Sequence, residues 1–172
     1  MPSRGTPALD LLARSGIEFR IHEYEPRELG LRQPGAGARS VDRHHFGVET
    51  AEALGVAPDR LYKTLVAAVD DRLAVGVVPV SAELDLKALA AAVDGRRATM
   101  AEPAAAERAT GYVVGGISPI GQRRVLPIVL DDAALAQATI YVSGGRRGLQ
   151  VELAPADLVR LVGARVERIR RL

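Results

Sequence analysis

The chain has 172 residues, of which 48% are hydrophobic and 26% charged, and its formal net charge is +2. This length suits one globular domain with a sizeable core, and so small a net charge does not by itself indicate a nucleic-acid-binding protein. The chain contains no cysteine, which excludes disulfides, thiolate metal sites and a cysteine nucleophile.

The N-terminal segment MPSRGTPALDLLARSG holds no apolar stretch of signal-peptide length, because Asp10 and Arg14 interrupt it. No window approaches the roughly 18 apolar residues of a membrane span. We therefore expect a cytoplasmic protein that makes no contact with a membrane. The aromatic share of 3% also argues against a surface of stacked aromatic platforms.

The first predicted element is a helix over residues 8–15. Thr6 and Pro7 have the pattern of an N-cap and a first helical residue, and Gly16 has that of a C-terminal stop. Residues 18–24 then alternate apolar and polar side chains, which predicts a strand with His22 and Tyr24 on one face.

Residues 26–46 are polar and include the run QPGAGARS, so they are predicted to form a long loop or local insertion. A short helix over residues 49–54 is predicted to follow and to end at Gly55. Because no repeat or composition boundary divides the chain, we expect a single domain over residues 1–172 that carries this insertion.

The central part of the chain predicts a β-hairpin, since residues 61–69 and 72–80 are strand-like and flank Asp70-Asp71. The remaining predicted elements are helices over 84–94, 102–110, 133–137 and 154–162, and strands over 97–101, 125–130, 139–143 and 149–153, before a basic segment at 164–172. Tight hairpins exclude a purely parallel sheet. We expect a mixed α/β (α+β) domain with a curved, barrel-like sheet flanked by short helices.

The segment GYVVGGISPIGQ, residues 111–122, contains four glycines. It is not a P-loop, because Gln122 and Arg123 stand where Lys and Ser/Thr are needed. Two explanations remain open. In the first, the glycines serve a sharp turn. In the second, they let free amides approach an anionic ligand. The second is favoured by the Arg pair at 123–124 and by a second loop, SGGRRG at 143–148, which also combines glycines with an Arg pair.

Lysine is rare in this arginine-rich chain, which has 23 basic residues of which only Lys63 and Lys87 are lysines. Lys63 shares an apolar strand face with Leu65 and Ala67. It is either an edge-strand lysine whose ammonium reaches water or a lysine at the lip of a pocket, where desolvation tunes its charge. Lys87 is predicted to point into solvent from a helix.

Other catalytic groups find little support in the sequence. The three histidines have no nucleophile setting, so a Ser-His-Asp triad is not indicated. His22 is expected to have a structural role, and His44-His45 lack further metal ligands. The acids Glu102, Asp131, Asp132 and Glu152 have the pattern of helix caps and surface charge. We expect no metal and no cofactor.

The sequence resembles the bacterial YbaK/EbsC family of Cys-tRNA(Pro) deacylases, relatives of the editing insertion domain of prolyl-tRNA synthetase. The resemblance runs from about Thr6 to the C-terminal helix, with a gap at residues 26–46. The segments that carry it are IHEYE, LYKTL, PVSAELDLKALA, TGYVVGGISPIGQ, LPIVLD and IYVSGGRRGLQVEL.

This resemblance implies an enzyme that clears cysteine from mischarged tRNA(Pro) in trans, with the tRNA acceptor end and prolyl-tRNA synthetase as partners. It implies that Lys63, Gly115 and Gly116 serve the chemistry, and that the substrate's own thiolate attacks its carbonyl. The residues it places around the substrate are Tyr24, Ile117, Ser118, Ser143 and Gly144. The candidates for contacts with the tRNA backbone are Arg123, Arg124, Arg146 and Arg147.

One departure from the family pattern concerns the residue after RGL, where this chain has Gln150 and the family often has an acid. A second departure is the insertion at 26–46. Two alternative functions therefore stay open. One is deacylation of alanine or another small residue on tRNA(Pro), and the other is a non-catalytic module that binds aminoacyl-tRNA or a nucleotide.

Overall fold

The computed structural model describes residues 5–25 and 40–172. Its helices are α1 Pro7–Ser15, α2 Ser40–Leu54, α3 Leu86–Ala92, α4 Pro103–Thr110, the 3-10 helix η1 Asp132–Ala136 and α5 Pro155–Val162. Its strands are β1 Phe19–Glu23, β2 Tyr62–Val69, β3 Arg72–Pro79, β4 Glu83–Leu84, β5 Ala98–Met100, β6 Ile128–Asp131, β7 Ile140–Ser143, β8 Leu149–Leu153, β9 Arg165–Glu167 and β10 Arg170–Arg171.

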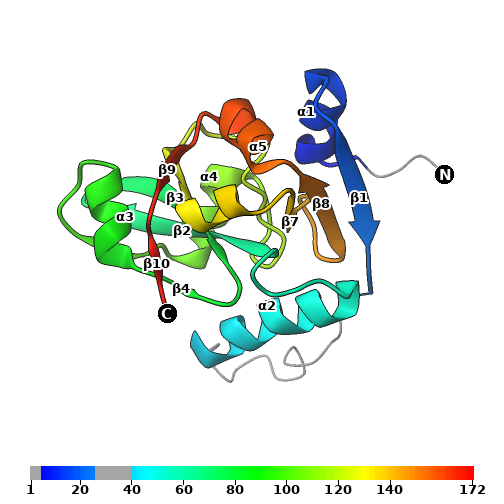
Figure 1. Cartoon of the computed structure of the whole chain (residues 1–172). Helices are drawn as coiled ribbons and strands as arrows, with labels where there is room; N and C mark the ends of the chain where they lie inside the picture. The colour runs from blue at the N-terminus through cyan, green and yellow to red at the C-terminus, as the bar shows by residue number, and fades with distance from the viewer. Residues whose placement is uncertain (1–4, 26–39) are drawn as a thin grey trace.

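The strands form a five-stranded sheet in the order β5-β2-β3-β6-β9, a three-stranded sheet in the order β1-β8-β7, and the pair β10-β4 (Figure 1). β6 pairs in parallel with β3 and β9, whereas the other ladders are antiparallel, so the prediction of a mixed sheet is confirmed. The barrel-like part of the prediction is not supported, because the sheet does not close. Among the described residues, the two larger sheets are joined by strand pairing only at one parallel bridge, Leu61 to Tyr141, and further along β2 the neighbour is β5.

Local signals placed most of the helices correctly. The Thr6 side chain caps α1 by accepting a hydrogen bond from the Leu9 amide at 3.2 Å, and Gly16 ends the helix in the left-handed conformation at φ 75°. The hairpin of β2 and β3 turns at Asp70 as predicted, with Val69 opposite Arg72.

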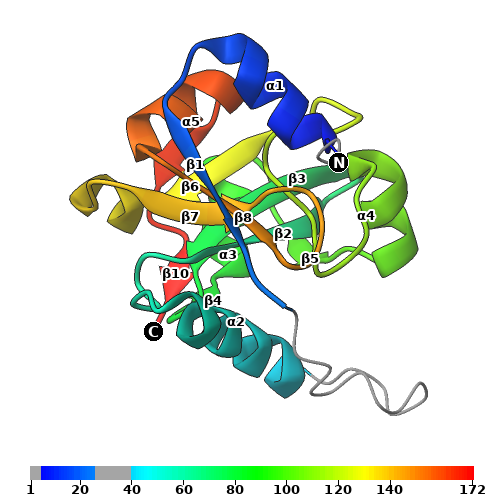
Figure 2. The same ribbon diagram turned by 90° about the vertical axis from the view of Figure 1, so that its right-hand side faces the viewer.

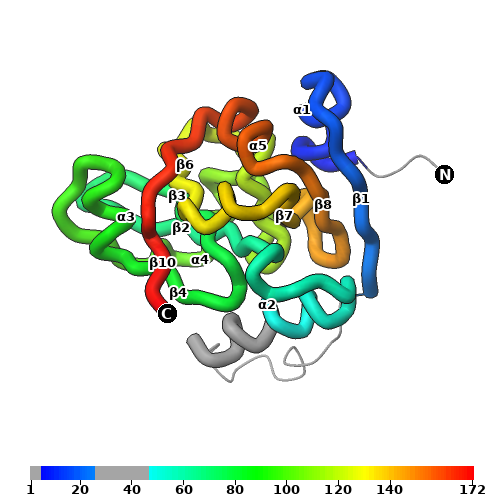
Figure 3. Tube along the Cα trace, viewed as in Figure 1, coloured from blue at the N-terminus to red at the C-terminus, as the bar shows by residue number. Residues whose placement is uncertain are grey.

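Two segments differ from the prediction. The helix predicted over 49–54 extends back to Ser40, so residues 40–46 are helical and the predicted loop is wrong there, while residues 26–39 lie outside the described part. The C-terminal basic segment forms β9, which adds to the edge of the five-stranded sheet beside β6, and β10, which pairs with β4; Figure 3 shows this segment beside α3. Each strand has three residues or fewer, which is too short to produce a readable alternation.

The five-stranded sheet has a core on each face. One face packs Val66, Val77 and Leu130 against α1, α4, α5 and the three-stranded sheet. The other face buries a smaller cluster under α3, β4 and the C-terminal segment, in which Val78 and Ile169 are 0% exposed. α2 lies at the end of the molecule near β4 and β1, where Ala51 packs on Leu61 and Tyr141 (Figure 2).

Asp131 fastens the C-terminal segment to β6. Its carboxylate is 0% exposed and accepts hydrogen bonds from the Ala133 amide at 3.0 Å, the Ile169 amide at 2.8 Å, and the amide and Nη1 of Arg170 at 2.9 and 2.8 Å. The predicted capping role is thus confirmed. The prediction that Asp131 belongs to the surface is wrong, because the strands that bury it were not recognised.

Candidate functional site

The glycine loop, residues 111–122, packs against the β7–β8 turn, residues 144–148. A Cβ on Gly116 would lie 2.8 Å from the Arg146 Cα, and one on Gly115, whose φ is 96°, would lie 2.5 Å from the Arg147 Nε. Both distances are too short for a real side chain. The two glycines therefore allow one loop of the chain to approach another, which supports the turn explanation for these positions.

The amides of the glycine loop are only partly used within the fold. The Gly116 amide donates to the Val113 carbonyl at 2.8 Å, which commits it to a turn. Among the described residues, the amides of Gly115, Ile117 and Ser118 donate to no acceptor. Of these three residues only Gly115 is exposed, so its amide is able to donate to a ligand oxygen, whereas Ile117 and Ser118 are buried. Gly116 is unsuited as a donor, because its amide is already used.

The side chains of Ile117 and Ser118 point into the fold. Ile117 is 8% exposed and belongs to the main core, and Ser118 is 0% exposed with its hydroxyl oxygen accepting from the Ile120 amide at 3.1 Å. Any contact they make with a substrate comes from their backbone. Gly144 is committed too, since its amide donates to the Leu149 carbonyl at 2.8 Å and its carbonyl accepts from the Thr6 hydroxyl.

Strand register brings four polar residues into one line, which we call the polar row: His22, Gln150, Ser143 and Lys63. Gln150 lies opposite His22 on one side and opposite Ser143 on the other. Leu61 and Tyr141 form an isolated parallel bridge, and Lys63 and Ser143 each follow their bridge residue by two positions, so their side chains point to the same side of the sheet as Leu61 and Tyr141. Neighbouring strands lie roughly 4.8 Å apart.

β2 lies between β5 and β3 in its sheet, so the interpretation of Lys63 as a residue of an edge strand is wrong. Lys63 itself pairs with Val78 of β3, and on its other side the described part of the chain pairs with β2 only at Leu61 and from Ala67 onward. Burial lowers the pKa of the Lys63 ammonium below its ordinary value of 10.5, and the charge of Glu83 acts in the opposite direction. Lys63 is thus a partly desolvated cation beside Ser143.

Gln150 occupies the centre of the polar row and is 8% exposed. Its Nε2 lies 3.5 Å from the Tyr24 hydroxyl, whereas its Oε1 is buried and has no hydrogen-bond partner. Tyr24 is held at the β7–β8 turn by its amide, which donates to the Gly148 carbonyl at 2.9 Å. A buried amide oxygen without a partner destabilises the fold unless a ligand supplies a donor.

A second group of side chains continues the same face, and we call it the Glu152 cluster: Glu152, His22, Arg60, Thr139 and Tyr141. The carboxylate of Glu152 accepts from the Thr139 hydroxyl at 2.6 Å, contacts His22 Nε2 at 2.9 Å and lies 3.4 Å from Arg60 Nη2. The Arg60 guanidinium lies 5.2 Å from the centre of the Tyr141 ring, and the His22 ring lies 5.0 Å from it.

Burial raises the pKa of Glu152, but hydrogen bonds from Thr139 and His22, together with the charges of His22 and Arg60, outweigh it and hold the pKa below its ordinary value. The prediction that Glu152 is an ordinary surface charge is wrong. The available signal was its alternation with Gln150 on one strand.

The four arginines proposed for tRNA contacts have different environments. Arg147 is half-buried and braces the two loops, because its Nη2 donates to the Val114 carbonyl at 3.0 Å. Arg146 is exposed and lies 3.7 Å from Glu23 Oε1. Arg123 and Arg124 are exposed beside the C-terminus of α4, where their amides donate to the Thr110 and Ala109 carbonyls.

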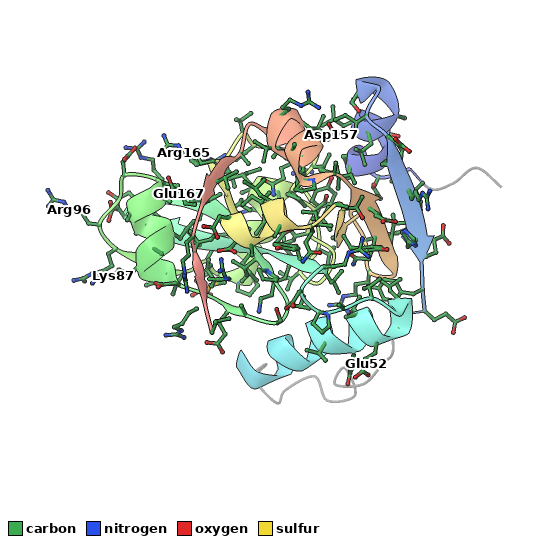
Figure 4. The ribbon with its side chains drawn as sticks, viewed as in Figure 1. Glu52, Lys87, Arg96, Asp157, Arg165 and Glu167 are labelled. Carbon is green, nitrogen blue, oxygen red and sulfur yellow. The ribbon has the colours of Figure 1, made fainter. Side chains whose placement is uncertain are left out.

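Lys87 points outward from α3, as predicted (Figure 4). Within residues 5–25 and 47–172, no group of three His, Asp or Glu side chains is arranged to hold a metal. The described helices include none with the length and apolar character needed to cross a membrane.

Comparisons with known proteins identify the family of the chain. The model of the family described as "Aminoacyl-tRNA editing domain" matches residues 45–161. The Enterococcus faecalis protein named "Putative Cys-tRNA(Pro)/Cys-tRNA(Cys) deacylase EbsC" is 39% identical over 128 residues, which cover 73% of this chain and 77% of that protein.

Two solved structures share the fold. One is the crystal structure of "a putative trans-editing enzyme for prolyl tRNA synthetase", with a TM-score of 0.71 and 24% identity over 90% of this chain and 87% of that chain. The other is the "hypothetical protein APE2540", with a TM-score of 0.79 and 22% identity over 96% of this chain and 100% of that chain.

Proposed function

This chain belongs to the aminoacyl-tRNA editing domain family, and on that premise we propose that it is a trans-editing deacylase that removes cysteine from mischarged Cys-tRNA(Pro). It would act in the cytoplasm on the acceptor end of the tRNA. We also propose that prolyl-tRNA synthetase, which produces the mischarged tRNA, is its partner.

The observation that carries the proposal is the parallel bridge between Leu61 and Tyr141, in a chain of this family. Lys63 and Ser143 each lie two residues beyond this bridge, which supports placing them on the same side of the sheet at the start of the β7–β8 turn. A partly desolvated ammonium favours a neighbouring anion more strongly than an exposed one does. The glycine loop packs on the same turn and offers the exposed amide of Gly115. An ester carbonyl that gains negative charge would meet both kinds of donor.

The reaction we propose uses the substrate's own side chain as nucleophile. The cysteine sulfur forms a bond to the ester carbonyl carbon, and the bond from that carbon to the ribose 3′-oxygen breaks. The electron pair goes to the 3′-oxygen, and the thiol proton ends on it. The products are a cysteine thiolactone and a tRNA with a free 3′-hydroxyl.

The protein's share in this reaction is positioning and charge stabilisation. Holding the thiol over the carbonyl turns the attack into an intramolecular step, which carries effective molarities of roughly 10⁵–10⁸ M in well-oriented systems. Each oxyanion donor contributes a factor of roughly 10²–10³ in rate.

Water attack on an alanyl ester would need a general base, and the polar row contains no carboxylate, while its histidine, His22, is separated from Ser143 by Gln150. The carboxylate of Glu152 is occupied by Thr139, His22 and Arg60. The site therefore favours a substrate that brings its own nucleophile over alanine. Gln150, in the place where the family often has an acid, is the feature that would suit a non-catalytic binding module.

A deacylation panel tests the proposal. Purified protein is mixed with Cys-tRNA(Pro), Ala-tRNA(Pro) and Cys-tRNA(Cys), each with and without prolyl-tRNA synthetase. We expect release from both cysteinyl-tRNAs and none from Ala-tRNA(Pro), with the synthetase increasing selectivity for tRNA(Pro). Release of alanine from Ala-tRNA(Pro) at the rate of cysteine release would exclude the thiol-assisted step. Binding of these tRNAs without release of any amino acid would exclude deacylase activity.

Lys63→Ala tests the role of the ammonium. We expect kcat/KM for Cys-tRNA(Pro) to fall by about 100-fold or more, since one charge-stabilising donor is lost. Lys63→Arg is the matched control, because it keeps the charge but not the compact shape, and it should retain part of the activity. Wild-type rates in Lys63→Ala would remove Lys63 from the chemistry.

A further inference from the structure

The Glu152 cluster lies next to the polar row on the same face of the sheet. His22 belongs to both groups, while Glu152 follows Gln150 by two residues on β8 and Tyr141 precedes Ser143 by two residues on β7. A strand advances roughly 3.3 Å per residue, so the cluster begins roughly 6.6 Å from Ser143 and Gln150. This is about the length of one nucleoside.

The cluster keeps planar groups partly open to solvent. The side chains of His22 and Arg60 are each 33% exposed, whereas the Tyr141 ring beneath them is 6% exposed. The open sides of an imidazole and a guanidinium are surfaces on which a nucleobase stacks.

These groups are held in place before any ligand arrives. Arg60 donates through Nε and Nη2 to the Thr139 carbonyl at 3.3 and 3.2 Å, and His22 is fixed through Nε2 to Glu152. Within the described part of the chain, His22 Nδ1 and Arg60 Nη1 make no hydrogen bond. They remain available to ribose hydroxyls, and little side-chain entropy would be lost on binding.

The two ends of the site differ in chemistry. The β7–β8 turn offers free amides and Arg146, which suit a phosphate or an oxyanion. The Glu152 cluster instead offers planar groups and hydrogen-bonding atoms, and because the charge of Arg60 is paired there with Glu152 at 3.4 Å, it attracts a phosphate less than free amides do. An aminoacyl ester at Ser143 and Lys63 is attached directly to a ribose, so the nucleoside must lie at one of these ends.

We propose that the Glu152 cluster is the subsite for the terminal adenosine of the aminoacylated tRNA, with the base on Arg60 and His22 and the ribose beside Gln150. The aminoacyl ester lies toward Lys63 and the 5′-phosphate toward Arg146. This assignment rests on the proposed function, because it takes the substrate to be an aminoacyl ester of a tRNA.

The test compares two substrates that differ in the nucleoside, Cys-tRNA(Pro) and cysteine ethyl ester. Arg60→Lys keeps the positive charge and removes the planar group. We expect its kcat/KM for Cys-tRNA(Pro) to fall about tenfold, as for the loss of one stacked base, while the rate with cysteine ethyl ester stays within about twofold of wild type. His22→Ala should act in the same direction.

Arg72→Lys is the matched control, because Arg72 is exposed at the opposite end of the β2–β3 hairpin. It should leave both rates unchanged. Thermal unfolding of each variant identifies any that fail to fold, in which case His22→Ala replaces Arg60→Lys. An equal loss with both substrates, or no loss with either, would overturn the proposal and leave the cluster a structural one.

Binding of adenosine, followed by NMR titration, separates this inference from the proposed function. We expect the shifts to centre on His22 and Arg60 and to weaken in Arg60→Lys but not in Arg72→Lys. If the wild-type protein binds adenosine in this way but deacylates no substrate, the proposed function is refuted and the adenosine subsite stands. Shifts confined to other parts of the chain would refute the subsite.

Discussion

Gln150→Leu is expected to make the protein more stable and less active at the same time. The Gln150 side chain is 8% exposed, its Oε1 has no partner, and its Nε2 has only the long contact of 3.5 Å with the Tyr24 hydroxyl. Leucine has a similar size and no polar atom. The substitution therefore removes an unpaired buried oxygen that destabilises the ligand-free protein. Under the proposed function it also removes a contact with the substrate.

The magnitude follows from the hydrogen-bond inventory of this one side chain. A buried polar atom without a partner costs about 1–3 kcal/mol, and a normal neutral hydrogen bond contributes about 0.5–1.5 kcal/mol. A contact as long as that of Nε2 contributes less than this. We expect a net gain near 1 kcal/mol in the free energy of unfolding, which corresponds to a rise of about 2–4 °C in Tm for a chain of this size.

Urea unfolding and deacylation of Cys-tRNA(Pro) are the two measurements. Loss of one neutral hydrogen bond to the substrate predicts a fall of about two- to tenfold in kcat/KM. Gln122→Leu is the stability control, because the Gln122 Oε1 is also buried without a partner but its Nε2 donates to the Ser118 carbonyl at 2.9 Å. This variant should gain less than Gln150→Leu.

Two results would refute this reasoning about Gln150. A loss of more than 1 kcal/mol in Gln150→Leu would mean that the amide stabilises the native protein rather than waiting for a ligand. Unchanged kcat/KM at higher stability would mean that the substrate does not reach this amide.

Three further predictions concern other parts of the molecule. Asp131→Asn should lower the free energy of unfolding in urea by about 3–5 kcal/mol, because it breaks a buried ion pair with Arg170; a change under 1 kcal/mol would contradict the structure. Burial lowers the Lys63 pKa from its ordinary value of 10.5. If the ammonium is the active form, kcat/KM corrected for spontaneous hydrolysis should therefore begin to decrease, as the pH rises, before pH 10.5 is reached. A kcat/KM that stays constant up to that pH would refute this role. Thr6→Val should lower the free energy of unfolding in urea by about 2 kcal/mol, for the lost cap on Leu9 and the lost hydrogen bond to the Gly144 carbonyl, and equal stability would mean that the Thr6 hydroxyl makes neither contact.

The elements that sequence patterns predicted correctly are those whose signals lie within one or two turns of the chain. Thr6 and Gly16 bracket α1, and Gly111 ends α4 at φ 80°. The alternation around Lys63 placed it correctly on the face with Leu65 and Ala67. The family, too, was identified from contiguous segments, and the match to residues 45–161 confirms it.

The assembly of the site depended on contacts between segments that are distant in sequence. Lys63 and Ser143 are 80 residues apart, and the bridge between Leu61 and Tyr141 brings them to the same side of the sheet. The same is true of Glu152, whose partners His22 and Arg60 come from two other segments. Register between strands is a long-range property, and no local pattern reports it.

The sequence by itself thus determined the helices with clear caps, the hairpin, the mixed sheet and the family, because caps, turns and alternation act over a few residues. Only the tertiary structure decided that Asp131 is buried, that the Gly116 amide is occupied, and that the sheet stays open. It also decided that the glycines of residues 111–122 accommodate the backbone at Arg146 and Arg147. Each of these depends on which distant backbone or side chain lies within a few ångströms, and packing of the whole chain sets that distance.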